Sequence, residues 1–190
     1  SVARVMIVTG SGERAFSSGV DLKERNDLAK DGTVGFNEFT SSRDWTRYGF
    51  FQARKPVIAA INGYCLAGGL EMSLSCDIRI AADNALFGLP EPRVGIVPAV
   101  GLVYLPRFIP MGEAMYILLT GERINAQEAY RIGLVHQVMP LADLIASATK
   151  IAEQIVECAP IPLQAIKLTV QQTAYVPPEL GSRLLNNLVG

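Results

Sequence analysis

The sequence is poor in the residues that build disulfide frameworks and metal sites. It has three cysteines in 190 residues, with no CxxC spacing, and a single histidine. The odd number of cysteines (Cys65, Cys76 and Cys158) indicates neither a disulfide framework nor a zinc site, and we expect buried or unreactive thiols in a reducing compartment. His136 has no second histidine for a metal site and no evident partner to orient it as a base, so we expect it to be structural.

The sequence also lacks strong charge patterning and long apolar runs. Its 17 Lys and Arg against 18 Asp and Glu give a formal net charge of −1, and no basic stripe occurs. Binding to nucleic acid or to an anionic membrane surface is therefore not expected. No signal peptide or membrane-spanning run is visible, and we expect a cytoplasmic location. The chain opens without Met directly on an apparent strand, as expected of a piece of a longer protein.

What is present indicates one globular α/β domain. Apolar residues make up 49% of the chain and charged residues 18%, which is enough for a large core. Runs rich in β-branched residues predict strands at 4–9, 57–62 and 77–83, with a short strand in 134–140. Apolar spacing predicts helices over 111–121, 125–133, 141–159 and 160–176, with Asn125 as a cap and Glu128 three residues later. Strands followed by helices predict an α/β fold with a helical C-terminal region.

The turn after the first strand, Gly10-Ser11-Gly12-Glu13-Arg14, superficially suggests a nucleotide loop. It lacks the third glycine of a dinucleotide fingerprint and the Lys-Ser/Thr pair of a P-loop, so we interpret it as a glycine-rich turn. Further on, Ser17, Ser18 and Gly19 are small enough for a backbone to approach a ligand closely. Asp21 then begins a helix-compatible run and is best explained as an ordinary helix cap.

A glycine pair precedes the first candidate catalytic residue. Gly68 and Gly69 follow a buried strand, and the residues after them fit a helix that begins near Gly68. The first turn of a helix has unpaired N–H groups, which suit a developing oxyanion. Glu71 lies in this turn. Acidic residues are common there because they interact favourably with the helix dipole, which is the simpler explanation for Glu71 by itself.

Glu91 is the second acidic residue in apolar surroundings. Pro90 and Pro92 flank it and exclude it from the interior of a regular helix or central strand. Two explanations remain open from the residues alone. Glu91 could serve chemistry, or it could form an ion pair with Arg93 or Arg107.

Four blocks of the sequence, in order, resemble the crotonase (enoyl-CoA hydratase/isomerase) superfamily over about residues 3–170. They are VMIVTGSGERAFSSGVDLKE, KPVIAAINGYCLAGGLEMSLSCDIRIAAD, ALFGLPEPRVGIVP and LLTGERINAQEAYRIGLVHQVMP. The resemblance implies a ClpP-like spiral of ββα units, in a chain shorter than usual at both ends. It also implies a crotonase core over 1–140 and, over 141–190, a helical region for oligomerisation and active-site cover.

The same resemblance implies roles for individual residues. Val20 and Gly68 match the positions whose amides form the oxyanion hole, and Glu71 and Glu91 match the two catalytic glutamates of hydratases. The implied coenzyme A site is Ser18, Val20, Asp21, Leu22 and Lys23. Coenzyme A enters as part of the acyl-CoA substrate, with no metal and no tightly bound cofactor. The implied assembly is a homotrimer or homohexamer.

The implied activity is hydration of a 2-enoyl-CoA, or the reverse dehydration, in fatty acid metabolism. Three departures leave the acyl group open. Ala67 stands where many hydratases have a third glycine, AVGLVYLPR replaces a GAGGTQRLPR-like stretch, and LPEPRVGIVP resembles the carnitinyl-CoA dehydratase branch. Carnitinyl-CoA dehydration, enoyl isomerisation and a catalytically silent binding protein are the alternatives. The aromatic residues Trp45, Tyr48, Phe50 and Phe51 fit either a core or an acyl pocket.

Overall fold

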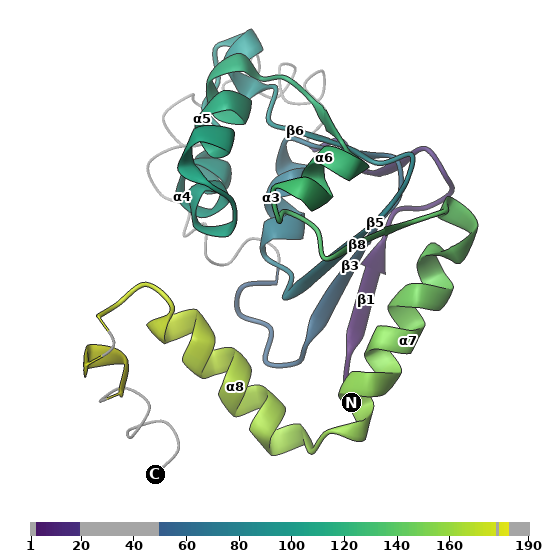
Figure 1. The fold of residues 1–190 in the computed structure, drawn as a ribbon, viewed down its shortest axis with the longest axis vertical. Helices are drawn as coiled ribbons and strands as arrows, with labels where there is room; N and C mark the ends of the chain where they lie inside the picture. Colours follow the sequence, from purple (N-terminus) through teal and green to yellow (C-terminus); the bar gives the residue numbers. More distant parts are fainter. Residues whose placement is uncertain (1–2, 20–49, 178, 183–190) are drawn as a thin grey trace, which may run out of the picture.

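The computed structural model describes residues 3–19, 50–177 and 179–182 (Figure 1). The predicted positions Val20, Asp21, Leu22 and Lys23, and the aromatic residues Trp45 and Tyr48, lie outside these ranges. The strands are β1 (Met6–Thr9), β2 (Ala15–Ser17), β3 (Val57–Ile61), β4 (Tyr64–Leu66), β5 (Ile78–Ala82), β6 (Leu86–Gly88), β7 (Ile124–Asn125) and β8 (Gln137–Met139). The helices are α3 (Gly68–Leu74), α4 (Ala99–Phe108), α5 (Met111–Thr120), α6 (Ala126–Arg131), α7 (Leu144–Glu157) and α8 (Pro160–Thr173), with 3-10 turns η2 (Glu91–Val94) and η3 (Leu141–Asp143).

The strands form two sheets that share a repeating connection. The first sheet has the order β1-β3-β5-β8 and is parallel throughout. The second has the order β2-β4-β6-β7, with β7 antiparallel to β6. Each of the pairs β1/β2, β3/β4 and β5/β6 places its first strand in one sheet and the next in the other. The chain therefore winds through successive β-β units, as the predicted spiral requires.

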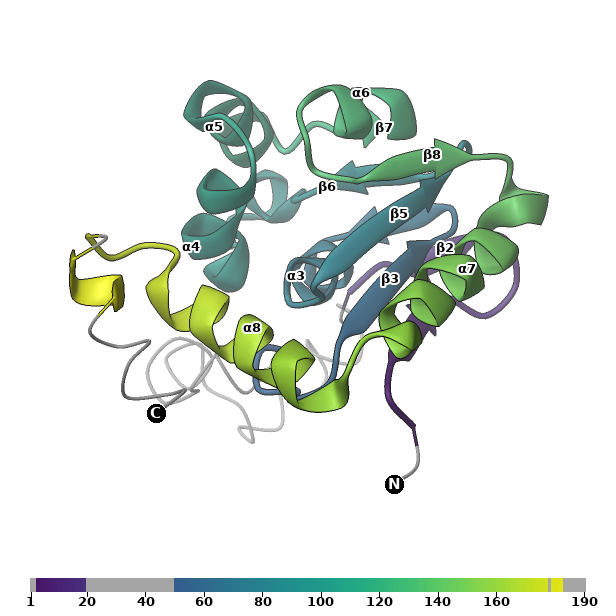
Figure 2. The ribbon, with the colours of Figure 1, turned by 60° about the horizontal axis from the view of Figure 1, so that its bottom comes forward.

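The central strands of the first sheet, β3 and β5, are buried on both faces. All five residues of β3 are buried, as expected for a parallel strand that is covered on both sides. On one face, Ile58, Ala60, Ile80 and Ala82 pack against Leu144 and Ala148 of α7. Figure 2 shows α7 lying across this sheet. On the other face, Val57, Ala59 and Ile61 join the larger core beneath α3, α4 and α5.

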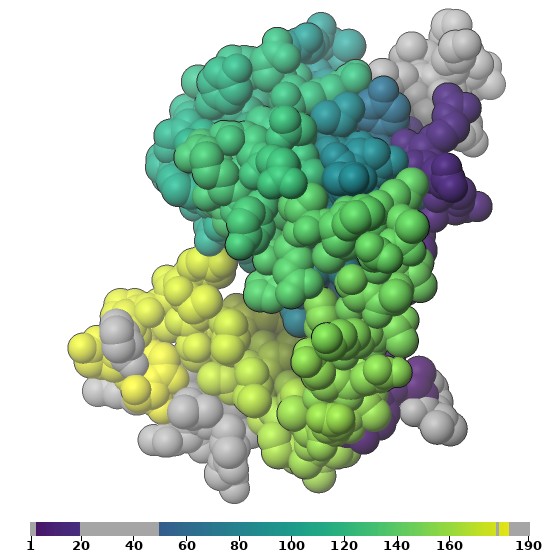
Figure 3. Space-filling model, turned by 45° about the vertical axis from the view of Figure 1, so that its right-hand side comes forward, coloured from purple at the N-terminus to yellow at the C-terminus, as the bar shows by residue number. Residues whose placement is uncertain are grey.

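Helix α8 is fixed to the body by an ion pair whose lysine is buried. Lys167 Nζ lies 2.7 Å from Asp77 Oδ2 and 2.9 Å from the Lys55 carbonyl oxygen. The same Asp77 oxygen accepts the Val57 N–H at the start of β3. In the space-filling view α8 is the yellow-green ridge beside α7 (Figure 3). Between α8 and the C-terminal halves of α3 and α4 lies a hollow of about 590 Å³.

The predicted strands of the first sheet and the predicted helices are confirmed, and the strands of the second sheet were missed. Strands β1, β3, β5 and β8 and helices α5 to α8 lie where the patterns placed them. Asn125 caps α6 as expected, because its Oδ1 accepts the Glu128 N–H at 2.8 Å. The strands of the second sheet were not predicted from the residues. No helix in the described ranges is long and apolar enough to cross a membrane.

Candidate active site

The candidate site is built around the start of α3. The first helical hydrogen bond of α3 runs from the Glu71 N–H to the Ala67 carbonyl, so the N–H groups of Gly68, Gly69 and Leu70 have no acceptor within the helix. Gly69 must be glycine, because an added Cβ would lie 2.2 Å from the Ser17 carbonyl oxygen of β2. This close approach places the amides of α3 directly beside the end of β2. The prediction of a helix start at Gly68 is confirmed.

Ala67, immediately before Gly68, has an unusual backbone. Its φ of 51° and ψ of −130° lie where glycine is favoured, and it is the one non-glycine residue with positive φ in the described ranges. Such conformations cost about 1–3 kcal/mol in a non-glycine residue. The conformation is held on both sides: the Ala67 N–H donates to the Gly88 carbonyl at 3.0 Å, and the Ala67 carbonyl accepts the Glu71 N–H at 3.1 Å. Strain is therefore stored at the start of α3.

Glu71 projects from the first turn of α3 to the start of another helix. Its Oε1 accepts the N–H groups of Val100 and Gly101, each at 2.9 Å, at the N-terminus of α4. Pro98 precedes α4 and supplies no side-chain cap, so the carboxylate of Glu71 serves in place of one. Glu71 is 8% exposed. The simple explanation from the dipole of its own helix is therefore incomplete, because the side chain caps α4.

Glu91 begins the 3-10 turn η2, so the prediction that its flanking prolines keep it out of a regular helix or strand is confirmed. Its Oε2 is buried without a hydrogen-bond partner. A buried oxygen with no partner disfavours the charged carboxylate. The pKa of Glu91 is raised to about 7: burial is the largest cause, a hydrogen bond from its own backbone N–H opposes the rise, and the nearby charge of Glu71 adds to it.

The two carboxyl groups are electrostatically coupled but differ in their surroundings. Burial also raises the pKa of Glu71, while the N–H groups of Gly101 and Val100 oppose that rise by stabilising its charged form. Glu91 has no comparable donors at Oε2. Glu71 is therefore the better placed of the two to carry the negative charge, and Glu91 the better placed to hold a proton.

The alternative explanation for Glu91, an ion pair with Arg93 or Arg107, is wrong. Arg93 instead contacts Glu122 and donates to the Thr120 carbonyl at 3.1 Å. The guanidinium of Arg107 lies over the ring of Tyr175 at 4.5 Å and over that of Tyr104 at 5.5 Å. Both cations are engaged elsewhere, so neither arginine explains the burial of the Glu91 carboxyl group.

Gly19 lies beside the start of α3, although it is far away in the sequence. A Cβ built on Gly19 would lie 3.0 Å from Gly68 N and 3.0 Å from Ala67 Cβ, and the φ of Gly19 is +86°. The described part of the Ser17-Ser18-Gly19 segment therefore approaches Gly68 closely, as its small residues predicted. Ser18 is exposed. Val20, Asp21, Leu22 and Lys23 follow outside the described ranges.

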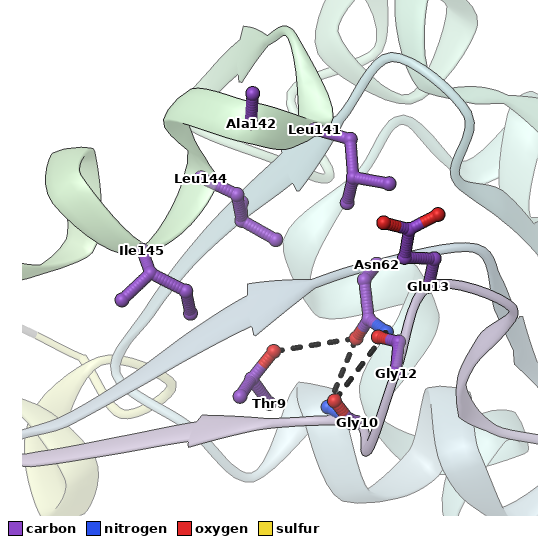
Figure 4. Close-up of a pocket in the computed structure, with 9 residues that line it drawn as sticks. All are labelled: Thr9, Gly10, Gly12, Glu13, Asn62, Leu141, Ala142, Leu144 and Ile145. Atoms are coloured by element: carbon purple, nitrogen blue, oxygen red, sulfur yellow. Dashed lines mark hydrogen bonds between the residues drawn. The ribbon is translucent and has the colours of Figure 1, made fainter.

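The glycine-rich turn after β1 is separate from this site. It borders a hollow of about 460 Å³ (Figure 4). The buried Asn62 side chain holds the turn: its Oδ1 accepts the Gly10 N–H at 2.9 Å, and its Nδ2 donates to the Gly12 carbonyl at 2.7 Å. These bonds use the turn's backbone groups to fix its own shape, which agrees with its interpretation as a glycine-rich turn.

Of the two described aromatic residues before β3, one packs in the core and the other lines the hollow beneath α8. Phe50 packs against the core, and its N–H donates to Ser75 Oγ at 2.8 Å. Phe51 stacks on Tyr104 with ring centroids 4.2 Å apart and lines the hollow beneath α8. In the stretch 101–104, which lies within the departing segment AVGLVYLPR, Leu102 and Val103 are about half exposed. Of these four residues, Gly101 is buried and Tyr104 packs against the core, so the stretch adds less apolar bulk inside than its composition suggests.

Reasoning from the sequence missed the two amides that hold Glu71. Val100 and Gly101 give no chemical signal as residue types. The available signal was Pro98, a residue that suits the start of a helix, with no capping side chain nearby, since a helix start without one needs acceptors from elsewhere. Of the cysteines, Cys65 and Cys76 are buried and Cys158 is exposed. The expectation of buried or unreactive thiols is therefore confirmed for Cys65 and Cys76 by their burial, and for Cys158 it stays a prediction.

Comparison with known proteins identifies the family. A family model described as enoyl-CoA hydratase/isomerase matches residues 1–184. The chain belongs to this family. The membership confirms the crotonase resemblance and the α/β fold, and with it the prediction of a hydratase-type enzyme of the crotonase family.

Individual relatives agree with this assignment. The chain is 40% identical over 186 residues to a carnitinyl-CoA dehydratase of Citrobacter koseri, covering 97% of this chain and 69% of that one. A solved enoyl-CoA hydratase of Bacillus anthracis is 39% identical, with a TM-score of 0.86, covering 98% of this chain and 72% of that one. A Mycobacterium tuberculosis enoyl-CoA hydratase is 32% identical, with a TM-score of 0.82, covering 97% and 70%.

Proposed function

We propose that this protein hydrates a 2-enoyl-CoA thioester to the 3-hydroxyacyl-CoA, or catalyses the reverse dehydration. The observation that carries the proposal is the coupled pair Glu71 and Glu91, whose carboxyl groups have different surroundings, at a helix start with free N–H groups. Hydration of a conjugated thioester needs a base for water, an acid for the α-carbon and donors for the carbonyl oxygen.

The oxyanion donors in this proposal are the amides of Gly68 and Val20. The N–H of Gly68 has no acceptor within α3, and Gly19 lies against Gly68. Val20 follows Gly19 directly in the chain, which supports its role as the second donor. Both donors would strengthen their hydrogen bonds as the thioester oxygen gains enolate charge. The backbone from Ser18 through Lys23 would then hold the coenzyme A moiety.

Glu71 is the base and Glu91 the acid in the hydration direction. Glu71 Oε1 is held by the α4 amides, which leaves Oε2 to accept a proton from water. The water oxygen forms its bond to the β-carbon, and the electron pair of the double bond moves toward the thioester carbonyl. Glu91, protonated because of its burial, gives its proton to the α-carbon as the enolate collapses. Glu71 ends protonated and Glu91 ionised, and exchange of one proton restores the starting state.

The acyl group has two candidates. The similarity to carnitinyl-CoA dehydratases at 39–40% identity favours a carnitinyl group, and the similarity to enoyl-CoA hydratases at 39% favours a simple enoyl group. A quaternary ammonium group binds well to aromatic faces. In the hollow beneath α8, Arg107 already lies over one face of Tyr104 and one face of Tyr175 and places a positive charge there. This observation favours an uncharged enoyl group if that hollow serves the acyl chain.

We also propose assembly into a homotrimer or homohexamer, with the region 141–190 contributing. Large apolar side chains that are exposed on one chain support it, because such residues commonly mark interfaces when they gather. They lie on α4, α5 and α8: Leu102, Val103, Met111, Met115, Leu119, Ile161, Ile166 and Val170. Light scattering on the purified protein would give a mass of three or six chains, and a monomer at micromolar concentration would contradict the proposal.

The test of the reaction is turnover of crotonyl-CoA and of the unsaturated carnitinyl analogue, each followed by loss of the enone absorbance. We expect Glu71→Gln and Glu91→Gln each to lower kcat by about 10²–10⁴-fold, since each removes one proton-transfer group. Glu153→Gln, on the exposed face of α7, is the matched control and should leave kcat unchanged. If neither substrate turns over, or if both site variants retain wild-type kcat, the proposal is wrong.

A further inference from the structure

The strained residue before α3 has no role in the mechanism described so far. Ala67 holds a backbone conformation that glycine would adopt without strain. It does so at the residue that joins β4 to the helix start, between a hydrogen bond to β6 through its N–H and one to Glu71 through its carbonyl. An alanine that costs stability therefore lies between Gly68, the proposed oxyanion donor, and the strand β6, and it is hydrogen-bonded to Glu71.

The methyl group of Ala67 borders the other segment of the site. Because a Cβ added to Gly19 would lie 3.0 Å from Ala67 Cβ, the methyl group faces the Gly19 backbone closely. The same added atom would lie 3.0 Å from Gly68 N. The methyl group and the Gly68 amide therefore border the same stretch of backbone, and a glycine at position 67 would leave the space of the methyl group empty.

Two physical effects follow from an alanine rather than a glycine at this position. The side chain restricts the rotation of the two peptide groups that flank it, which narrows the range of directions available to the Gly68 N–H. The Ala67 carbonyl, bonded to Glu71 N–H, also fixes the backbone from which the Glu71 side chain projects. Glycine at position 67 would relieve the strain. It would also widen the range of directions of the Gly68 N–H and the range of positions of the backbone that carries Glu71.

We propose that Ala67 is a positioning residue: its strained backbone and its methyl group hold the Gly68 amide in the direction needed for the thioester oxygen. The inference rests on the proposed function. The inference goes beyond the proposed function because Ala67 touches no reacting atom and acts through Gly68 and Glu71. The stability lost at Ala67 is exchanged for pre-organisation of an oxyanion donor.

The test is Ala67→Gly in the full chain, with thermal unfolding, steady-state kinetics and one spectroscopic readout. We expect Tm to rise by about 2–4 °C from relief of the strain. We expect kcat to fall about tenfold with little change in KM, a part of the 10²–10³-fold cost of losing an oxyanion donor outright. The carbonyl stretch of bound ¹³C-labelled butanoyl-CoA should shift less from its solution value than in the wild type, because the Gly68 N–H polarises it less.

Two further variants separate positioning from general backbone effects. Ala67→Ser keeps a Cβ and should keep kcat and the carbonyl shift near the wild-type values. Gly133→Ala introduces strain at a φ of +82° with no atom within 4 Å of the added carbon. It should lower Tm and leave kcat unchanged.

The outcomes distinguish this inference from the proposed function. If the wild type does not turn over an enoyl-CoA and the carbonyl band of bound butanoyl-CoA does not shift, the proposed function is wrong. The proposed role of Ala67 is then wrong as well. If the wild type is active and Ala67→Gly retains its kcat and its carbonyl shift, the positioning role alone is wrong. A lower Tm for Ala67→Gly would contradict the assignment of strain.

Discussion

The two sides of the molecule differ in how their residues are packed. The side formed by the first sheet and α7 is apolar, with Ile58, Ala60 and Ile80 buried against Leu144. The side formed by the second sheet, α3 and η2 holds a strained alanine, a buried carboxyl oxygen without a partner, and Gly69, where an added Cβ would lie 2.2 Å from the Ser17 carbonyl oxygen. The first side supplies stability, and the second carries strain and unpaired polar atoms around the groups that react in the proposed function. Substitutions should therefore separate stability from activity according to the side on which they fall.

The largest expected effect on stability alone lies in the α7 cluster. Ile80 is fully buried between β3, β8 and α7. Ile80→Ala should lower the free energy of unfolding by about 2–5 kcal/mol, because it leaves a cavity as well as removing apolar contacts. Urea unfolding measures the change, and crotonyl-CoA turnover of the folded fraction should be unaffected. A tenfold loss of kcat in that fraction would contradict the proposal that substitutions on this side affect stability and not activity.

Gly69→Ala should affect both properties. The added methyl group meets the Ser17 carbonyl carbon and oxygen, so either α3 or β2 must move. We expect a loss of about 1–3 kcal/mol in the free energy of unfolding from overpacking. Activity should fall as well, because the displaced helix start carries the Gly68 amide. Gly112→Ala, at the start of α5 with no atom within 4 Å of the new carbon, is the control and should leave both unchanged.

The smallest expected effect is a pH dependence of stability that comes from Glu91. Because burial raises the pKa of Glu91 from 4.5 to about 7, the folded state holds this proton more tightly than the unfolded state. Stability from this group is present below about pH 4.5 and is lost as the pH rises through about 7. Glu91→Gln should therefore gain stability relative to the wild type between pH 5 and about pH 8. Unfolding midpoints in urea at those two pH values measure the gain, and an equal difference at both would contradict the raised pKa.

The fold was predicted where its elements are long. Strands β3 and β5 show runs of Val, Ile and Ala, and α7 shows a clear apolar spacing, so packing and pattern agree. The strands of the second sheet have two or three residues each and include Gly88, Cys65 and Tyr64. Runs this short cannot show an alternating pattern. They become strands only because neighbouring strands pair with them.

The site was predicted in part for a similar reason. The glycine pair and the prolines around Glu91 are local signals, and both indicated the right backbone. The bonds from Glu71 to Val100 and Gly101 join residues 29 and 30 positions apart, and no local pattern carries them. The conformation of Ala67 is also invisible in the sequence, because alanine gives no turn signal. Tertiary contacts impose both features.

The most direct test of the account is the pH dependence of kcat/KM for hydration of crotonyl-CoA by the full chain. If protonated Glu91 is the acid, kcat/KM should fall as the pH rises through about 7, by about tenfold per pH unit at the alkaline end. Glu153→Gln should reproduce this profile. A profile that is flat from about pH 6 to pH 9 would contradict the assignment of Glu91 as the acid.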